Sequence, residues 1–274
     1  MHCYTDFSKL IALLTFSLSS LALSQQSDDP SLTIYTYVMP GLINDADGSA
    51  VGPGVDTIEM LFTQHNLNAE FIIQPFARVS ESTKKDIQSC SFPVDWTASR
   101  ATELEYVIPL ASVQPTLYSL TPEVTMLRSL KGQYVVTLNN YASQDMLDSL
   151  EASKILVSHP AQAFPLLLNR RVDYLFMDKP MADAIMVSLG SKLSEVHQFK
   201  TSSTWLVCNK NLELPSKIEL QKSLLAILQE GELETRWRDA GLHDLYLAFF
   251  GQGGVQWQIL LEQTKPIYKS DSVD

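Results

Sequence analysis

Short apolar runs alternate with stretches of helical spacing along most of this chain. The runs LTIYTY, EFIIQP, SCSFPV, QYVVTL, KILVSH, DYLFMD and WLVCN have the length and composition of buried strands. Between them lie segments with apolar residues three or four positions apart, such as VDTIEMLFTQH, SQDMLDSLEA, PAQAFPLLLNRR and KIELQKSLLAILQEGELETRWRDAG. Because buried strands that alternate with helices are joined by crossovers, this pattern predicts an α/β fold with mostly parallel sheet.

Polar and small residues mark the expected ends of the helices. Ser143 precedes QDML as a candidate N-cap, and Pro215 and Ser216 precede the long helical segment near the C-terminus. We expect this helix to end at Gly241, because glycine readily adopts the left-handed conformation that ends a helix. The sequence therefore predicts one long helix from about residue 217 to residue 240.

The N-terminus has the pattern of a secretory signal peptide. Lys9 precedes an apolar run at residues 10–23, and the small residues Ala22 and Ser24 follow the spacing of a cleavage site. A membrane anchor is the alternative, but the run is short against the roughly 20 apolar residues that a bilayer needs. We therefore expect residues 1–24 to be cleaved and the mature protein to be soluble and exported.

Composition and motifs exclude several classes of function. The chain has 274 residues, of which 45% are hydrophobic, and a formal net charge of -11, which argues against binding nucleic acid or anionic membranes. No G-x-S-x-G, P-loop, G-x-G-x-x-G or H-E-x-x-H motif occurs, and the histidines show no metal-ligand spacing. We expect no catalytic residue, no cofactor and no metal site, and therefore a binding protein rather than an enzyme.

Two cysteines remain after the signal peptide is removed. Cys90 and Cys208 each lie in an apolar, strand-like run, which by itself favours two buried free thiols. An even pair of cysteines in an oxidising compartment also suits a disulfide. Both alternatives stay open at the level of composition.

The segment FPVDWTASRATELEYVIPL contains a spaced motif. It places Thr97 and Arg100 ahead of Tyr106 and Pro109, and this order resembles a motif of the family-3 extracytoplasmic solute-binding proteins of ABC transporters, the binders of polar amino acids. Over about residues 30–245, four further pieces match the family pattern in the right order. Upstream are Gly48, Gly52, Val55 and Asp56; downstream are Leu130, Gly132 and Val135, then Arg171, Asp173 and Asp178, and last the closing helical segment LLAILQEGELETRWRDAGL. The chain looks like a divergent branch of this family.

The resemblance implies a two-lobe, type II periplasmic-binding-protein fold, in which two crossing strands form a hinge and the ligand occupies the cleft between the lobes. It implies a first lobe at 30–115 and 205–274, including a C-terminal tail, and a second lobe at 116–204. SCSF and WLVC then become neighbouring strands of the first lobe. This placement makes a disulfide between Cys90 and Cys208 as acceptable as two free thiols.

The resemblance also implies a set of ligand-binding residues. Arg100 is expected to bind a ligand carboxylate, which suits the planar fork of a guanidinium, whereas the alternative is a surface arginine at a helix start. Asp178 is expected to bind the ligand ammonium group, or else to cap a helix. Thr97 either donates its hydroxyl to the carboxylate or caps the following turn. Tyr37 and Phe76 either enclose the ligand side chain or pack in the core.

Several positions depart from the usual family pattern or indicate the divergent branch. Pro40 is followed by Gly41, where the family often has an aromatic residue. Asp95 stands where a serine or threonine is usual, five residues before Arg100, so it either competes for this arginine, repels a ligand carboxylate or attracts a cationic ligand. The second-lobe loop that usually contains G-T-T reads NYA here, with Tyr141 at its centre. Arg78 in PFAR either adds a second cation to the cleft or is solvated.

These features together predict a periplasmic solute-binding protein that captures a small polar, amino-acid-like ligand for ABC-type transport. We expect a monomer that binds no nucleic acid and docks on an ABC transporter permease. One alternative is a ligand-sensing module for a membrane receptor. The other is a dehydratase-like periplasmic enzyme on the same fold, with Asp95 as an acid or base beside Arg100.

Overall fold

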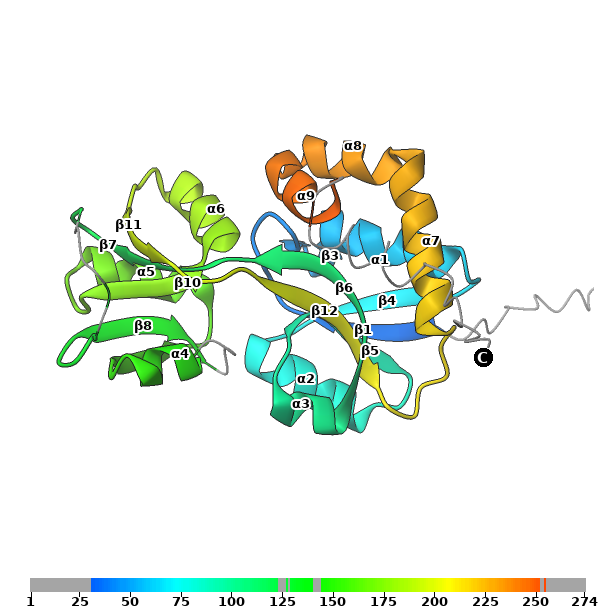
Figure 1. The fold of residues 1–274 in the computed structure, drawn as a ribbon, viewed down its shortest axis with the longest axis horizontal. Helices are drawn as coiled ribbons and strands as arrows, with labels where there is room; N and C mark the ends of the chain where they lie inside the picture. The colour runs from blue at the N-terminus through cyan, green and yellow to red at the C-terminus, as the bar shows by residue number, and fades with distance from the viewer. Residues whose placement is uncertain (1–30, 123–126, 128, 140–143, 252–253, 255–274) are drawn as a thin grey trace, which may run out of the picture.

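The computed structural model describes residues 31–122, 127, 129–139, 144–251 and 254 (Figure 1). The described elements form two lobes, each built around one β-sheet with helices packed against it. Long strands run from the larger lobe toward the smaller one and connect them. The two-lobe α/β architecture that was expected from the sequence is therefore confirmed.

The described part of the first lobe contains a five-stranded sheet. Its strand order is β4 (Asn68–Ile73), β1 (Ser31–Thr36), β5 (Ser89–Asp95), β12 (Ser202–Asn209) and β6 (Leu104–Val113). Its helices are α1 (Pro53–Thr63), α2 (Phe76–Lys85), α3 (Ala98–Glu103), α7 (Lys217–Glu230), α8 (Glu232–Asp239) and α9 (His243–Phe250). A short hairpin of β2 (Asn44–Ala46) and β3 (Ser49–Val51) precedes α1.

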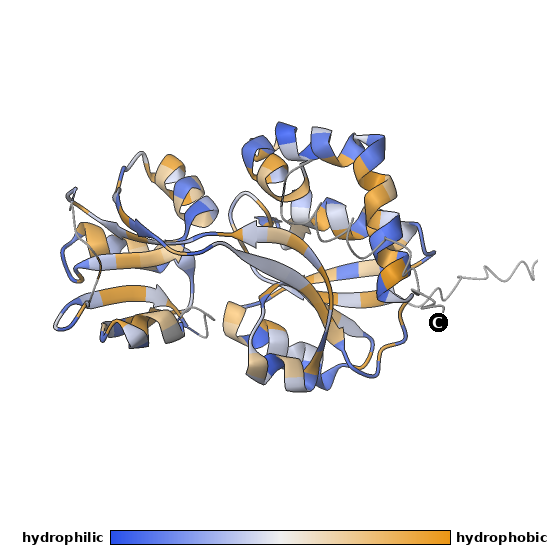
Figure 2. Ribbon diagram, in the orientation of Figure 1, coloured by the Kyte–Doolittle hydropathy of each residue, from blue (hydrophilic) through white to orange (hydrophobic). Residues whose placement is uncertain are grey.

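The second lobe contains a sheet that also has five strands among the described residues. Its order is β11 (Ser194–Gln198), β7 (Pro115–Ser119), β10 (Tyr174–Asp178), β8 (Tyr134–Leu138) and β9 (Ser153–Val157). Its helices are α4 (Gln144–Ser149), α5 (Pro160–Leu168) and α6 (Lys179–Leu189). In both lobes the apolar residues concentrate on the strands and on the inward faces of the helices, as the hydropathy colouring shows (Figure 2).

Both sheets are mixed rather than mostly parallel. The pairs β1–β4, β1–β5, β8–β9 and β8–β10 are parallel, as the alternation of strands and helices predicted. In contrast, β12 is antiparallel to β5 and β6, and β7 is antiparallel to β10 and β11. The antiparallel pairs all involve strands next to the lobe connections, where the chain leaves one sheet and enters the other without a crossover helix.

The chain passes between the sheets at two places. β6 ends at Val113 and β7 begins at Pro115, so a single residue separates a first-sheet strand from a second-sheet strand. On the return, β11 ends at Gln198 and β12 begins at Ser202. The lobe boundary that was expected between residues 204 and 205 therefore falls inside β12.

Local sequence explains where several helices begin and end. Gly52 precedes α1 with φ of 124°, and a Cβ atom there would lie 2.8 Å from the carbonyl oxygen of Leu42, so only glycine fits. Ser216 caps α7 through a capping box with Glu219. The expected single long helix is wrong, because Gly231 adopts the left-handed conformation and separates α7 from α8.

Cys90 and Cys208 form a disulfide in the first lobe. The antiparallel register of β5 and β12 places these residues opposite each other, and their sulfur atoms are 2.03 Å apart. The bond joins a strand of the N-terminal half to the strand that returns from the second lobe. It therefore closes a loop with a sequence separation of 118 residues that includes the whole second sheet.

The expected signal peptide and the expected N-cap Ser143 lie outside the described residues. Within the described part of the chain, no helix has the length and apolar composition required to cross a membrane.

Candidate functional site

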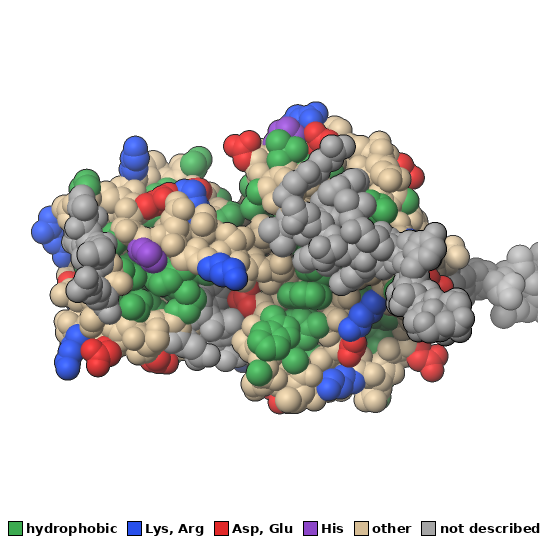
Figure 3. Space-filling model, viewed as in Figure 1, with side chains coloured by type: hydrophobic (Ala, Val, Ile, Leu, Met, Phe, Trp, Pro, Cys, Tyr) green, Lys and Arg blue, Asp and Glu red, His purple; other side chains and the backbone are tan. Residues whose placement is uncertain are grey.

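A pocket of about 410 Å³ lies between the two sheets, next to the strands that connect them. The first lobe and its connecting strands contribute Asp95, Trp96, Val113, Ser202, Ser203 and Trp205, and the second lobe and the linkers contribute Pro115, Met146, Asp178 and Lys200. The space-filling view shows acidic and hydrophobic side chains near the line where the two lobes meet (Figure 3). Pockets of this size, with mainly apolar walls and few charged groups, are typical of small-ligand sites.

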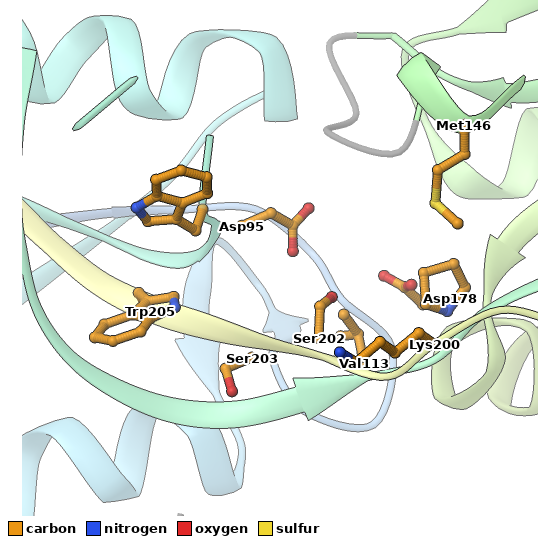
Figure 4. A pocket seen from close by; sticks show the side chains of 10 residues that line it. Asp95, Val113, Met146, Asp178, Lys200, Ser202, Ser203 and Trp205 are labelled. Atoms are coloured by element: carbon orange, nitrogen blue, oxygen red, sulfur yellow. The ribbon is translucent and has the colours of Figure 1, made fainter. Parts of the chain in front are cut away.

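Asp95 is the last residue of β5 and is held firmly through its backbone. Its carbonyl oxygen accepts hydrogen bonds from the hydroxyl of Tyr106 at 2.8 Å and from Nη1 of Arg100 at 3.2 Å. The same tyrosine oxygen accepts a hydrogen bond from the backbone N–H of Thr97 at 3.4 Å. These contacts fix the strand end, so the carboxylate is presented to the pocket by a rigid backbone (Figure 4).

The environment of Asp95 favours the protonated carboxyl group more than water does. Burial raises its pKa from 3.8 to about 6, although the nearby charge of Arg100 acts in the opposite direction. Asp95 nevertheless keeps an intermediate solvent-exposed area, because its side chain faces the open pocket. Filling that pocket with a cation would reverse the effect and favour the carboxylate.

Asp178 is the last residue of β10 and lies at the opposite wall of the pocket. Its side chain is only 1% exposed, and within the described residues its Oδ1 atom has no hydrogen-bond partner. It occupies the N-cap position of α6, but its side chain makes no capping hydrogen bond. Burial, and secondarily the charge of Asp95, raise its pKa well above the usual value. A buried acceptor without a partner is costly, so this atom is suited to a donor that enters the pocket.

Thr97 and Arg100 both have structural partners. The hydroxyl of Thr97 accepts a hydrogen bond from the backbone N–H of Arg100 at 3.1 Å and thereby caps α3. Arg100 is bound to the carbonyl of Asp95 and is absent from the described lining of the pocket. Its charge still influences the pKa values of Asp95 and Tyr37, so it lies close to the site.

Tyr37 and Phe76 lie together, with ring centroids 4.6 Å apart in an edge-to-face arrangement. Tyr37 is 5% exposed and packs in the core of the first lobe. Its pKa is raised well above 10.0 by burial and then by the charges of Asp95 and Asp178. Tyr37 therefore lies close enough to feel the charges of both aspartates, and neither ring of the pair is part of the described pocket lining.

Two other residues expected at the site do not take part in the described pocket. Arg78 lies on α2 with its side chain exposed and does not line the pocket. Tyr141 lies outside the described residues.

Several pocket residues were missed by the sequence analysis. Trp96 is 58% exposed, and Trp205 packs edge-to-face on Tyr106 at 5.9 Å. The antiparallel register of β5 and β12 brings Trp205 opposite Val94, next to Asp95. Trp96 directly follows Asp95, so its signal was present, whereas Trp205 reaches the site only through strand pairing.

Comparisons with known proteins support the fold. No protein-family model matches the sequence, and no curated protein matches it either. Solved structures do match. A histidine kinase sensor domain with similarity to periplasmic binding proteins aligns with a TM-score of 0.68 and 16% identity, over 77% of this chain and 95% of that one.

Two ligand-bound structures are similar to the same extent. The GluR0 ligand-binding core from Nostoc punctiforme in complex with L-glutamate has a TM-score of 0.66 and 17% identity, over 80% of this chain and 99% of that one. The amino acid ABC transporter substrate-binding protein AbpA from Streptococcus pneumoniae, bound to L-arginine, has a TM-score of 0.65 and 16% identity, over 78% and 96%. The chain therefore has the two-lobe periplasmic-binding-protein fold, and the resemblance inferred from its motifs is confirmed at the level of fold.

Proposed function

We propose that this protein captures a small polar solute between its two lobes and is an extracytoplasmic solute-binding protein. The observation that carries this proposal is the Oδ1 atom of Asp178, which is buried at the pocket wall without a hydrogen-bond partner among the described residues. A ligand donor would satisfy it. The transporter component AbpA and the GluR0 core, which share the fold, were solved with amino acids bound.

The proposed roles follow from the positions of the residues. Asp178 and Asp95 bind the positive end of the ligand, while Trp96 and Trp205 contact its apolar part. Arg100 remains a candidate for a ligand carboxylate, and it also positions Asp95 through the carbonyl hydrogen bond. Thr97 caps α3, and Tyr37 and Phe76 pack against each other, so their role in binding is indirect. Ligand contacts of Arg78 and Tyr141 stay predictions.

We propose that the lobes divide at Gln114 and within residues 199–201, and that they move as rigid bodies about these connections. Ligand between the two sheets would favour the closed arrangement, because it contacts both lobes at once. The closed form would then be recognised by an ABC transporter permease. Closure on a ligand also explains how groups from both lobes contribute to one small pocket.

Export to the periplasm is proposed on two grounds. Residues 1–24 have the pattern of a cleaved signal peptide. The disulfide between Cys90 and Cys208 suits an oxidising compartment. Mass spectrometry of the protein from the periplasm tests both, with an N-terminus at Gln25 and a mass lower by two hydrogens than the reduced form as the expected results.

A thermal-shift screen of the purified protein against amino acids, amines and small organic acids tests solute capture. Ligand at a hundredfold over its dissociation constant should stabilise the folded state by about 2.7 kcal/mol, which amounts to a shift of several degrees. Asp178→Asn should abolish the shift, whereas Asp183→Asn, a change of the same kind on the surface of α6, should preserve it. Absence of a shift with every compound would count against solute capture.

A sensory role is the second candidate. It is favoured by the similarity to a histidine kinase sensor domain, of which the alignment covers 95%. In this role the ligand-bound form would act on a membrane receptor and transport nothing. Uptake of a radiolabelled ligand by cells with and without the protein separates the two roles, since only a transport protein changes uptake.

We further propose that the protein is not an enzyme. Burial raises the pKa of Asp95 to about 6, which would suit an acid or base. The proposal is supported by the similar structures, which are a substrate-binding protein, a ligand-binding core and a sensor domain. Prolonged incubation of the protein with a cyclic acid of the prephenate type, followed by chromatography, should therefore return the compound unchanged.

A further inference from the structure

Building on the proposed function, we propose that the pocket selects organic cations and that Asp95 and Asp178 hold one ammonium or guanidinium group between them. A ligand carboxylate is then not required for binding. The inference concerns the class of ligand only. Solute capture is a separate proposal, and it can hold even if this inference is wrong.

The first argument is the position of the two acids. Asp95 ends a strand of the first sheet, and Asp178 ends a strand of the second. Both side chains line the same pocket, and their carboxyl groups point into the space between the lobes (Figure 4). A cation in this space would contact an acid from each lobe, so it would link the lobes directly.

The second argument is the balance of charge around this space. Arg100 and Lys200 are basic groups near it, and Lys179, which follows Asp178, is paired with Asp183 and Glu195. The hydroxyls of Tyr37, Tyr106 and Tyr118 also lie within electrostatic reach of one or both aspartates. Arg100 is bound to the backbone carbonyl of Asp95. Lys200 is exposed at the rim, and within the described chain no ion pair within 4.0 Å joins it to either aspartate.

Two acids that face each other repel when both are ionised, and burial increases that cost. The energetic cost of burial is larger for Asp178 than for Asp95, because the Oδ1 atom of Asp178 is buried without a described partner. An ammonium or guanidinium group removes both penalties, since it neutralises the charge and donates a hydrogen bond. A ligand carboxylate placed in the same space would add to the repulsion.

The third argument is the composition of the remaining wall. Trp96 and Trp205 present aromatic rings, and Val113, Pro115 and Met146 present aliphatic or thioether surface. Aromatic faces attract cations and their attached methylene groups. This wall therefore fits an alkyl chain attached to the cation, and a volume of about 410 Å³ limits the ligand to a small molecule.

Isothermal titration calorimetry with matched probes tests the inference. L-arginine and agmatine both carry a guanidinium and an amino group, but only L-arginine has a carboxylate; putrescine has two ammonium groups, and L-glutamate has a net negative charge. We expect agmatine or putrescine to bind within tenfold of the affinity of L-arginine, and L-glutamate not to bind. Binding of L-arginine without agmatine or putrescine would overturn the inference but preserve solute capture.

Variants of the aspartates give the second half of the test. Asp95→Asn and Asp178→Asn should each weaken binding of the cationic probe at least tenfold, and Asp183→Asn on α6 should leave it unchanged. An affinity that Asp95→Asn does not alter would overturn the two-acid arrangement. Circular dichroism of each variant separates loss of binding from loss of folding.

Proton exchange supplies a readout that a purely structural role would not affect. Asp95 and Asp178 together should release protons when a cation binds at pH 6. The measured heat of binding should therefore depend on the ionisation enthalpy of the buffer. The affinity for the cation should fall as pH decreases below 6. Asp95→Asn should reduce the number of protons released. Buffer-independent heat and an affinity that is constant from pH 5 to pH 7 would contradict the inference. Binding of none of the cationic probes would also contradict it, and a thermal shift with another solute would then preserve the proposed function.

Discussion

The two lobes present the same chemical group to the pocket in different ways. In the first lobe, Asp95 lies on a strand end that is held by Tyr106 and Arg100, and its side chain is partly exposed. In the second lobe, Asp178 is 1% exposed and has no capping bond to the helix that it precedes. One lobe therefore offers a positioned acid. The other contains a buried acid whose Oδ1 atom has no hydrogen-bond partner among the described residues.

The lobes also differ in covalent bracing. The first sheet contains the disulfide between Cys90 and Cys208, which joins adjacent strands. Within the described residues, the second sheet relies on packing and hydrogen bonds. We therefore expect the first sheet to resist unfolding more than the second.

Removal of the disulfide should have the largest effect on stability. Replacement of Cys90 and Cys208 by alanine releases a loop of 118 residues and should lower the free energy of unfolding by about 2–5 kcal/mol. Urea denaturation measures the change as a lower midpoint. Hydrogen exchange should show the loss mainly in β5 and β12, and an equal loss in β8 and β10 would contradict the idea of a braced first lobe.

Asp178→Asn should separate binding from stability. Loss of one buried charged partner commonly costs about 2–5 kcal/mol in binding, which corresponds to a decrease in affinity of about 30-fold or more. The free energy of unfolding of the ligand-free protein should stay the same or rise, because a buried ionisable group is removed. A ligand-free protein that is clearly less stable would show that Asp178 has a structural partner.

The stability of the ligand-free protein should depend on pH through the two acids. The folded-state pKa of Asp95 is raised from 3.8 to about 6, so the folded state binds more protons and this contribution is lost as pH rises from about 4 through 6. Other carboxyl groups such as Glu195 have lowered pKa values and act in the opposite direction.

The comparison of wild type with Asp95→Asn isolates the contribution of this one group. Between pH 4.5 and pH 7.5 the wild type should lose on the order of 1–2 kcal/mol relative to the variant, with allowance for the partial exposure of the side chain. Thermal denaturation at each pH measures this difference. A constant difference across the range would show that burial does not shift Asp95.

A matched pair of tyrosine variants should give the smallest effects and opposite signs. Tyr106→Phe removes the donor to the carbonyl of Asp95 and should cost about 0.5–1.5 kcal/mol of stability. Tyr118 in β7 is fully buried, and no hydrogen bond of ordinary geometry reaches its hydroxyl from the described residues, although Thr116 lies beside it. Tyr118→Phe should therefore be neutral or stabilising. Chemical denaturation of both variants measures this difference in the free energy of unfolding. An equal loss of stability in the two variants would contradict the prediction.

Much of the fold was predictable from local sequence patterns. The apolar runs marked strands of both sheets, and the motifs around Thr97, Gly52 and Asp178 indicated the two-lobe arrangement. The division of the long C-terminal helix was missed because only Gly241 was taken as a helix end, whereas Gly231 also adopts the left-handed conformation. Antiparallel strands such as β7 and β11 were missed because they depend on pairing across the lobe connections rather than on local periodicity.

The site was predictable in part. Asp95 and Asp178 were both identified, because each stands at a strand end where a resemblance singled it out. Trp205 and Lys200 were not, since they reach the pocket only through the register of β12 and the connection that precedes it. Strand register depends on contacts between residues far apart in sequence, and a single sequence does not reveal it.

A crystal structure of the protein with a compound identified in the thermal-shift screen tests the central claim most directly. The account predicts density for the compound between the sheets, with a ligand donor at hydrogen-bond distance, about 2.7–3.2 Å, from Oδ1 of Asp178. The result that would contradict it is an unoccupied interlobe pocket with Oδ1 of Asp178 bonded to a group of the protein itself and the compound bound elsewhere.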